Sequence, residues 1–213
     1  MIKTLASALI LSALLAGCGS GAKEAGPAPQ APTSSEPTAT ETAPTTSTES
    51  SATQSTTTAP EPVSCAPQTG GEKGVYTNLV DVRVGAHDGF DRIVFEFAAP
   101  SPNPGGKGGI PRYEIRTAKP PFSEDPSDMP IQVEGDAFAR IVFQGASGYD
   151  FNGNATYAGP RRLTPGFGTL AQVVEGGDFE ATMTWILGLS RPTCWQVQEL
   201  HNPDRLVIDF HHV

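Results

Sequence analysis

The sequence has few of the residues from which active sites and nucleic-acid interfaces are built. Only four of its 213 residues are histidine, and no block of Lys or Arg interrupts a chain whose formal net charge is −9. Binding to nucleic acid or to an anionic lipid surface depends on a positive patch, so the composition argues against both. The apolar run from Leu5 to Leu15 is too short to span a bilayer as a helix.

Catalytic motifs are also lacking. A zinc hydrolase needs well-spaced histidine ligands and a general base, but neither His-Glu-x-x-His nor His-x-x-Glu-His occurs. There is no Gly-x-Ser-x-Gly, and the glycine-rich stretches 105–109 and 145–153 lack the Lys-Ser/Thr ending of a phosphate loop. We interpret Asp88, Asp91 and Asp204 as turn-capping residues and not as a glycosidase pair. The sequence therefore predicts no metal, no cofactor and no catalytic residue.

The N-terminal segment has the features of an export signal. Lys3 supplies a positive charge before the apolar run, and the residues Leu-Ala-Gly-Cys at 15–18 are similar to the lipobox of bacterial lipoproteins. This resemblance implies that residues 1–17 are a signal peptide and that the Cys18 sulfur carries a lipid. Two or more acyl chains would anchor the protein stably to the outer face of the cytoplasmic membrane. The alternative is a plain secreted protein with a spare cysteine.

Residues 18–64 are dominated by Ser, Thr, Pro and Ala, with scattered Glu. Such a segment buries too little apolar area to offset the entropy lost on ordering, so we expect a disordered tether. A flexible chain of this length spans roughly 35–40 Å root-mean-square, and a fully polyproline one about 140 Å. The tether is either a stalk that carries the following domain into the wall or a passive spacer open to O-glycosylation.

Two further cysteines follow Cys18, and an even pair in an exported chain predicts a disulfide. Cys65 lies at the start of the expected domain, and Cys194 opens a late strand. The bridge would close a loop of about 130 residues and stabilise the fold by about 4–5 kcal/mol if loop entropy dominates. The alternative is two buried thiols.

Residues 65–213 show the two-residue period of half-buried strands. After a turn at 201–204, apolar residues alternate through Phe210, and similar phrases occur at 91–97 and 140–143. About nine such segments are separated by loops rich in Pro and Gly, and none demands a helix. The pattern predicts an all-β fold, a two-sheet antiparallel β-sandwich with internal symmetry that follows the tether.

One hairpin can be placed in more detail. The residues Glu-Gly-Gly-Asp at 175–178 have the composition of a hairpin turn between the strands 171–174 and 179–187. Along the second strand, Trp185 shares a face with other apolar residues, so we expect it in the core. On the exposed sheet face, we expect Arg92 and Arg205 to pair with neighbouring carboxylates.

Two of the strand phrases resemble a known family. The residues Asn-Pro-Asp-Arg-Leu-Val-Ile-Asp-Phe at 202–210 resemble the closing strand of AMIN domains. Residues 87–97 are similar to the opening signature of the AMIN-like domain of secreted actinobacterial lipoproteins. The resemblance covers about residues 75–213. It implies a β-sandwich that localises envelope proteins, commonly by binding peptidoglycan, and in which any amidase activity belongs to a separate domain.

The segment 149–162 is the candidate for ligand recognition, because loops on a rigid sandwich commonly carry binding sites. Exposed rings of Tyr149 and Tyr157 would stack on sugar faces, and Arg161 or Arg162 would bind the carboxylates of a muropeptide. The alternative is that this segment only covers the end of the core.

The sequence thus predicts a lipid-anchored, non-catalytic module of the cell envelope that binds peptidoglycan or another wall glycan. The alternative is an envelope scaffold that binds a protein partner through a sheet edge or a loop.

The lipobox interpretation predicts the outcome of one substitution. Cys18→Ala removes the sulfur that carries the lipid, so the protein should move from the membrane fraction to the medium or remain as an unprocessed precursor. Fractionation and immunoblotting measure this. Normal cleavage together with unchanged membrane association would contradict the interpretation.

Overall fold

The computed structural model describes residues 59–101 and 107–212. The expected signal peptide 1–17, Cys18 and the linker up to residue 58 lie outside the described residues. The described part forms thirteen strands: β1 (Gln68–Gly70), β2 (Thr77–His87), β3 (Phe90–Ala98), β4 (Arg112–Ala118), β5 (Phe122–Ser123), β6 (Pro130–Ile131), β7 (Ala137–Gln144), β8 (Ala146–Ser147), β9 (Arg162–Leu163), β10 (Leu170–Phe179), β11 (Thr182–Leu189), β12 (Trp195–Leu200) and β13 (Asp204–His211). No described residue belongs to a helix with the length and apolarity needed to cross a bilayer.

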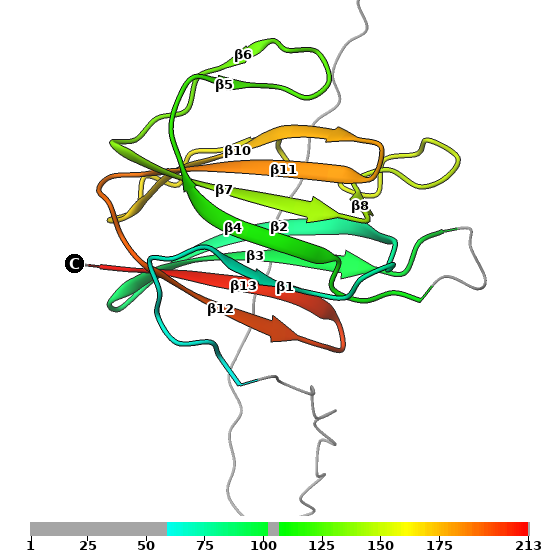
Figure 1. Cartoon of the computed structure of the whole chain (residues 1–213), viewed down its shortest axis with the longest axis horizontal. Coiled ribbons are helices and arrows are strands. Elements are labelled where there is room, and N and C mark those ends of the chain that lie inside the picture. Colours follow the sequence, from blue (N-terminus) through cyan, green and yellow to red (C-terminus); the bar gives the residue numbers. More distant parts are fainter. Residues whose placement is uncertain (1–58, 102–106, 213) are drawn as a thin grey trace, which may run out of the picture. The chain divides into compact units, whose positions relative to one another are not determined.

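The strands pack as two sheets face to face (Figure 1). The six-stranded sheet has the order β1-β4-β7-β11-β10-β9, and the five-stranded sheet has the order β12-β13-β3-β2-β8. A separate ribbon consists of β5 and β6. Neighbouring strands are antiparallel, except that the short β8 pairs parallel with β2. The predicted all-β sandwich is therefore confirmed.

The three similar sequence phrases form three inner strands: β3 and β13 are neighbours in the five-stranded sheet, and β7 lies inside the six-stranded sheet. Aromatic rings join the two layers. Phe95 meets Phe143 edge-on with a centroid distance of 5.1 Å and Trp185 with a centroid distance of 5.7 Å. All three side chains are fully buried, and each such burial stabilises the fold by about 1.5–3 kcal/mol. The prediction that Trp185 belongs to the core is confirmed.

The predicted turn at residues 175–178 is wrong. β10 continues through these residues with a register shift between Glu175 and Gly177, and the chain turns at Glu180 and Ala181, which both have positive φ. The glycines instead allow the backbone of Asp125 to approach β10 closely, and the Asp125 N–H donates to the Gly176 carbonyl at 2.9 Å. A β-carbon on Gly177 would lie only 2.5 Å from the Asp125 oxygen. Glycine inside a strand commonly marks such a bulge.

The N-terminal segment of the described chain is fastened to β12. Cys65 and Cys194 form the predicted disulfide. Beside it, Ser64 and Trp195 exchange backbone hydrogen bonds of 2.8 and 3.1 Å, and the Glu61 N–H donates to the Val197 carbonyl at 3.0 Å. Strand-like pairing thus begins a few residues before Cys65, where the sequence analysis places the domain boundary.

A buried carboxylate joins the two sheets. Asp91 of β3 is fully buried and accepts hydrogen bonds from the backbone N–H groups of Thr169 at 2.6 Å and Leu170 at 2.8 Å. Its other oxygen lies 3.1 Å from Nε2 of His212. The interpretation of Asp91 as a cap of its own turn is wrong, because it holds a segment 78 residues away. Asp204 does act locally, where its carboxylate lies 2.8 Å from Nδ1 of His201.

The charges on the exposed face of the five-stranded sheet pair in part as predicted. Arg92 makes two hydrogen bonds to Asp209, at 2.7 and 2.8 Å. Arg205 instead donates to the Pro203 carbonyl at 3.3 Å. Fixed pairing of Arg92 and Asp209 joins β3 to β13 on the side away from the core.

The role of Asp91 predicts a large stability difference between two neighbouring aspartates. Asp91→Ala leaves two buried N–H groups without an acceptor, so the free energy of unfolding should fall by about 3 kcal/mol. Asp88→Ala, in the exposed turn before it, is the control and should change stability by less than about 0.5 kcal/mol. Urea unfolding followed by tryptophan fluorescence measures both, and equal effects would contradict the cross-sheet role.

Candidate functional site

Two surfaces at opposite ends of β7 combine accessible apolar groups. The aromatic loop, residues 148–157, follows the end of β7, whereas a pocket surrounds its first residue, Ala137. An eight-residue strand is roughly 25 Å long, so the two surfaces are well separated. In Figure 1 the aromatic loop lies on the right, and the connection from β11 to β12, which lines the pocket, lies on the left.

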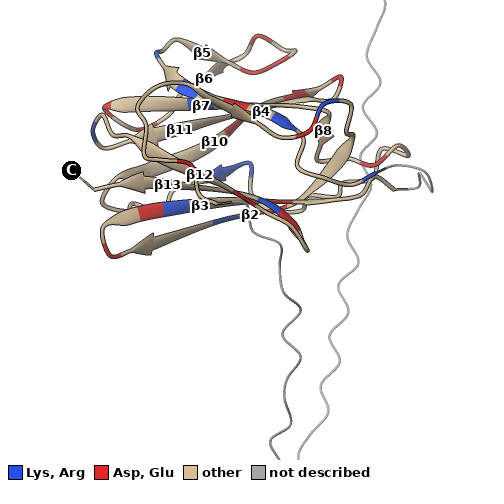
Figure 2. Cartoon of the chain, turned by 60° about the horizontal axis from the view of Figure 1, so that its bottom comes forward, with Lys and Arg blue, Asp and Glu red and all other residues tan. Residues whose placement is uncertain are grey.

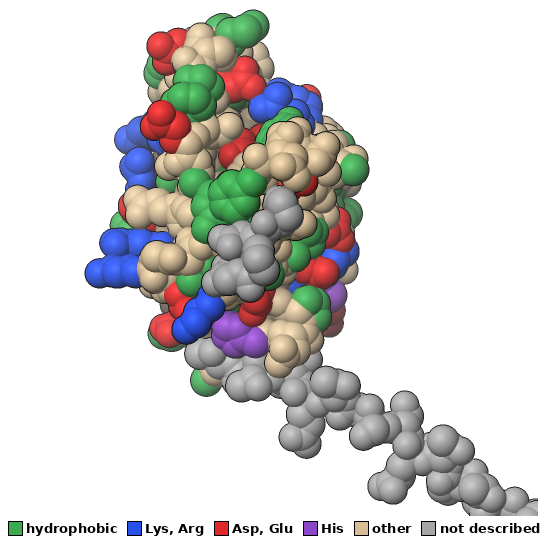
Figure 3. All heavy atoms as spheres, turned by 90° about the vertical axis from the view of Figure 1, so that its right-hand side faces the viewer, with side chains coloured by type: hydrophobic (Ala, Val, Ile, Leu, Met, Phe, Trp, Pro, Cys, Tyr) green, Lys and Arg blue, Asp and Glu red, His purple; other side chains and the backbone are tan. Residues whose placement is uncertain are grey.

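The aromatic loop presents large rings to solvent. Tyr149 is 50% exposed and Phe151 is 55% exposed, although both are large hydrophobic side chains. The Phe151 ring stacks on Tyr76, with a centroid distance of 4.7 Å and an interplanar angle of 22°. Figure 3 views this end of the domain and shows hydrophobic side chains at the centre of the face. Aromatic rings clustered on a surface commonly mark a contact site.

Hydrogen bonds accepted by Asp150 fix the conformation of the loop. Its Oδ1 accepts the backbone N–H groups of Asn152 and Asn154 at 2.8 Å, and its Oδ2 accepts the Asn154 side-chain amide at 2.9 Å. The bonds from Asn154 are the main reason that the pKa of Asp150 lies below its usual value. Gly153 adopts a φ of 81° at the tight turn, which glycine reaches without strain. The ring of Phe151 is therefore displayed by a loop with a defined shape.

Buried and half-buried polar side chains hold the loop to the sandwich. Asn78, which is 1% exposed, donates from its amide to the Tyr149 carbonyl at 2.7 Å. Asp178 accepts hydrogen bonds from the Gly148 N–H at 2.7 Å and the Ser147 hydroxyl at 3.1 Å. Burial nevertheless raises the pKa of Asp178 above its usual value. The Thr156 hydroxyl donates to the Leu79 carbonyl at 2.9 Å.

The second predicted tyrosine has a different environment. Tyr157 packs edge-on against Trp185 at a centroid distance of 6.0 Å, and its hydroxyl donates to the Pro160 carbonyl at 2.9 Å. Burial is the main cause that raises its pKa to about 12. Tyr157 thus covers the core in the way that the alternative interpretation of this segment describes, while Tyr149 faces solvent.

Both predicted arginines are bonded to neighbouring groups. Arg161 donates to Glu124 and Glu175, at 2.8 Å in each case. Arg162 donates to the Gln132 carbonyl at 2.9 Å and to the Gln172 side-chain oxygen at 2.6 Å. Among the residues that the structure describes, no hydrogen bond, ion pair or ring contact joins either arginine to Tyr149.

Two further aromatic residues, Phe151 and Tyr76, lie beside this loop but are not among the sequence-predicted site residues. The exposure of Phe151 could have been predicted, because the Asp, Asn and Gly residues around it are typical of a tight turn, which exposes side chains. The position of Tyr76 could not have been predicted, since nothing in the sequence pairs the residue before β2 with a loop some seventy residues later. Together with Tyr149 they form the aromatic surface of the loop.

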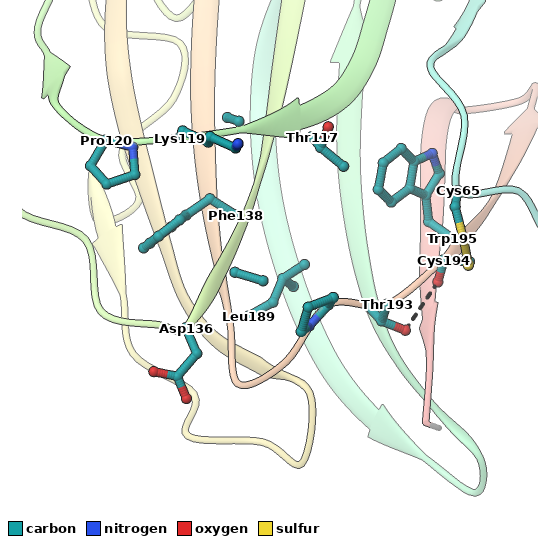
Figure 4. A pocket seen from close by; sticks show the side chains of 13 residues that line it. Cys65, Thr117, Lys119, Pro120, Asp136, Phe138, Leu189, Thr193, Cys194 and Trp195 are labelled. Carbon is teal, nitrogen blue, oxygen red and sulfur yellow. Dashed lines mark hydrogen bonds between the residues drawn. A yellow bond between two sulfur atoms is a disulfide. The ribbon is translucent and has the colours of Figure 1, made fainter.

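The pocket at the start of β7, which we call the end pocket, has a volume of about 690 Å³ (Figure 4). The ends of β4 and β11 and the starts of β7 and β12 surround it. Its lining is mostly apolar: Ala118, Pro120, Ala137, Phe138, Leu189, Pro192, Trp195 and the Cys65–Cys194 disulfide, with Thr117, Lys119, Asp136 and Thr193 as the polar members.

The remaining electrostatics offer no further site. Within residues 59–101 and 107–212, no group of three His, Cys, Asp or Glu side chains is placed to hold a metal ion. Figure 2 shows Lys and Arg interspersed with Asp and Glu over the strands, without a basic block. The described surface therefore supports contact through aromatic and apolar groups better than through concentrated charge.

Comparison with known proteins identifies one family. The model of the AMIN-like domain matches residues 77–212, which is well over half of the chain. No curated protein and no solved structure matches the sequence. The matched range begins with β2 and ends after β13, so it contains the aromatic loop, while Cys65 and β1 precede it.

The contacts of the two arginines predict a pH-dependent difference. Hydrogen bonds from the Ser127 hydroxyl, the larger cause, and from Arg161 hold the pKa of Glu124 below its usual value. The stabilisation that the Glu124 carboxylate gives the fold is therefore present above its unfolded-state pKa and is lost as acid protonates the carboxyl. Through its pair with Glu175, Arg161→Ala should lower the free energy of unfolding at pH 7 by up to about 1 kcal/mol, a solvent-screened value. The part of the loss that comes from Glu124 should disappear in acid, once its carboxyl is protonated.

Arg162→Ala is the matched control. Its partners are a carbonyl and an amide, which do not titrate, so its effect should be independent of pH. Thermal unfolding across the acid range measures both variants. Parallel pH profiles for the two would contradict the assignment of Arg161 to the carboxylates.

Proposed function

The chain belongs to the AMIN-like domain family, and on that premise we propose that it is a lipid-anchored module that binds wall glycan through its aromatic loop. AMIN-like domains are typically non-catalytic modules of the extracytoplasmic envelope with a peptidoglycan-related role. In this proposal, Cys18 carries the lipid, and the tether is the segment between Cys18 and Glu61, where pairing with β12 begins. The described domain makes the contact with the polymer.

The observation that carries the proposal is the exposed ring surface of Tyr149 and Phe151. Aromatic faces are flat and apolar, and they complement the apolar faces of sugar rings, while the tyrosine hydroxyl supplies a polar edge. Because Asp150, Asn78 and Asp178 already fix the loop, little conformational entropy remains to be lost on binding. A preformed contact of this kind suits a repetitive polymer.

The arginines have a supporting role in this proposal. The guanidinium group of Arg161 is occupied by Glu124 and Glu175, so gripping a muropeptide carboxylate would require these ion pairs to break. We propose that Arg161 and Arg162 hold β9 and its neighbours in place, and that Tyr157 covers the core beneath them.

The tether makes modest affinity sufficient. A domain held within tens of ångströms of the membrane by this tether would meet the wall polymer at high effective concentration. Many weak contacts along the polymer would then retain the protein at the wall, while each contact remains reversible.

One observation favours the second candidate, a protein scaffold. Beyond Asn78, the outer edge of β2 has no strand partner among the described residues, since β8 pairs only with Thr77 and Asn78. An open edge accepts an extended peptide as an additional strand. Charged residues such as Asp81 and Arg83 along β2 restrict unselective pairing of this edge.

Sedimentation with protein-free sacculi tests the glycan proposal. The double substitution Tyr149→Ala and Phe151→Ala should weaken binding about tenfold, which corresponds to about 1.4 kcal/mol. Both side chains are half exposed, so thermal unfolding should change little. Met129→Ala, which removes another exposed apolar side chain outside the aromatic loop, is the control and should bind like the wild type.

Two outcomes would contradict the proposal. If the wild type fails to sediment with sacculi, wall glycan is not the ligand and the scaffold function takes its place. If it sediments and the double variant sediments equally, the aromatic loop is not the contact surface.

A further inference from the structure

The end pocket is separate from the aromatic loop, and the proposed wall contact does not use it. We propose that the end pocket binds a single hydrocarbon chain that ends in a carboxylate. This inference does not depend on the glycan proposal, because the two surfaces lie at opposite ends of β7.

The lining chemistry selects the body of the ligand. Alanine, proline, leucine and aromatic side chains and a disulfide form most of the wall. Of the two threonines, Thr193 already donates its hydroxyl to the His211 carbonyl. A sugar or peptide would bring hydroxyl or amide groups that find few partners here, and each unpaired group costs about 1–3 kcal/mol. A hydrocarbon brings none, so the wall favours an aliphatic chain over the wall polymer.

The size of the pocket is suited to one such ligand. Its volume of about 690 Å³ lies within the range of about 300–1,000 Å³ that is typical of small-molecule sites. The space exists in part because a small residue, Ala137, stands at the start of β7, where a larger side chain would fill it. Leu189 and Trp195, both almost fully buried, belong to its wall.

The two charged side chains of the lining, Lys119 and Asp136, indicate which head group the ligand carries. Figure 4 shows the Lys119 amine turned toward the pocket, whereas the Asp136 carboxylate turns away from it. Neither side chain forms an ion pair with any described residue, so the Lys119 ammonium is available to an anion. In a chain with a net charge of −9, an unpaired cation beside an apolar pocket complements an amphipathic anion.

Tryptophan fluorescence offers a direct assay, because Trp195 lines the end pocket and the only other tryptophan, Trp185, lies in the core. A bromine-labelled fatty acid quenches a tryptophan that it approaches closely. Added to the full chain below its micelle concentration, it should quench fluorescence saturably. Unlabelled octanoate, decanoate and dodecanoate should compete, with affinity rising about fourfold per added methylene.

Substitutions locate the ligand. Ala137→Leu and Thr117→Leu each place a larger side chain in the end pocket and should reduce affinity at least tenfold. Two variants are used so that misfolding of one does not leave the test without a result. Lys119→Ala should weaken dodecanoate about two- to fivefold and leave dodecanol unchanged. Lys73→Ala, which removes an exposed lysine that is not part of the lining, is the control.

The results decide the proposal. Saturable quenching that both leucine variants reduce supports it. Absence of saturable quenching, or equal quenching in folded leucine variants and wild type, overturns it. If dodecanol binds as tightly as dodecanoate and Lys119→Ala has no effect, the carboxylate assignment is wrong.

Discussion

Aromatic packing between the two sheets is the contact on which the rest of the domain depends. Phe95 of the five-stranded sheet lies against Phe143 and Trp185 of the six-stranded sheet, and all three are fully buried. Interiors are close-packed, so this contact sets a fixed spacing between the layers. The ends of the sandwich thereby become rigid supports. Both the aromatic loop and the end pocket use such an end, where strands stop and side chains can face solvent.

Buried and half-buried polar side chains connect this rigid core to the loops. Asp91 carries the start of β10, while Asn78 and Asp178 carry the aromatic loop, and each makes several hydrogen bonds with good geometry. A satisfied buried network specifies one arrangement, because any alternative leaves a group unpaired. The exposed rings of Tyr149 and Phe151 therefore rest on an ordered base, which is the property that a binding loop requires.

The sequence predicts the elements that depend on a local pattern of residues. Alternation identified the inner strands and Trp185, and export with paired cysteines identified the disulfide. Local pattern does not predict contacts between segments that are far apart in the sequence. The glycines at 176–177 allow a close contact with Asp125, and Asp91 is hydrogen-bonded to a segment 78 residues away. The end pocket gathers residues from four separated parts of the chain, so no local signal marks it. At the candidate site, the sequence predicts Tyr149 but not Phe151 or Tyr76, whose rings stack on each other.

The most direct measurement of the central claim is a titration of the isotope-labelled domain with soluble glycan fragments released from sacculi, followed by backbone amide chemical shifts. If the aromatic loop binds wall glycan, the largest changes should fall on residues 148–157 and on Tyr76, with the strands of the core unaffected. Changes concentrated along the outer edge of β2, or no changes at saturating fragment, would contradict the account.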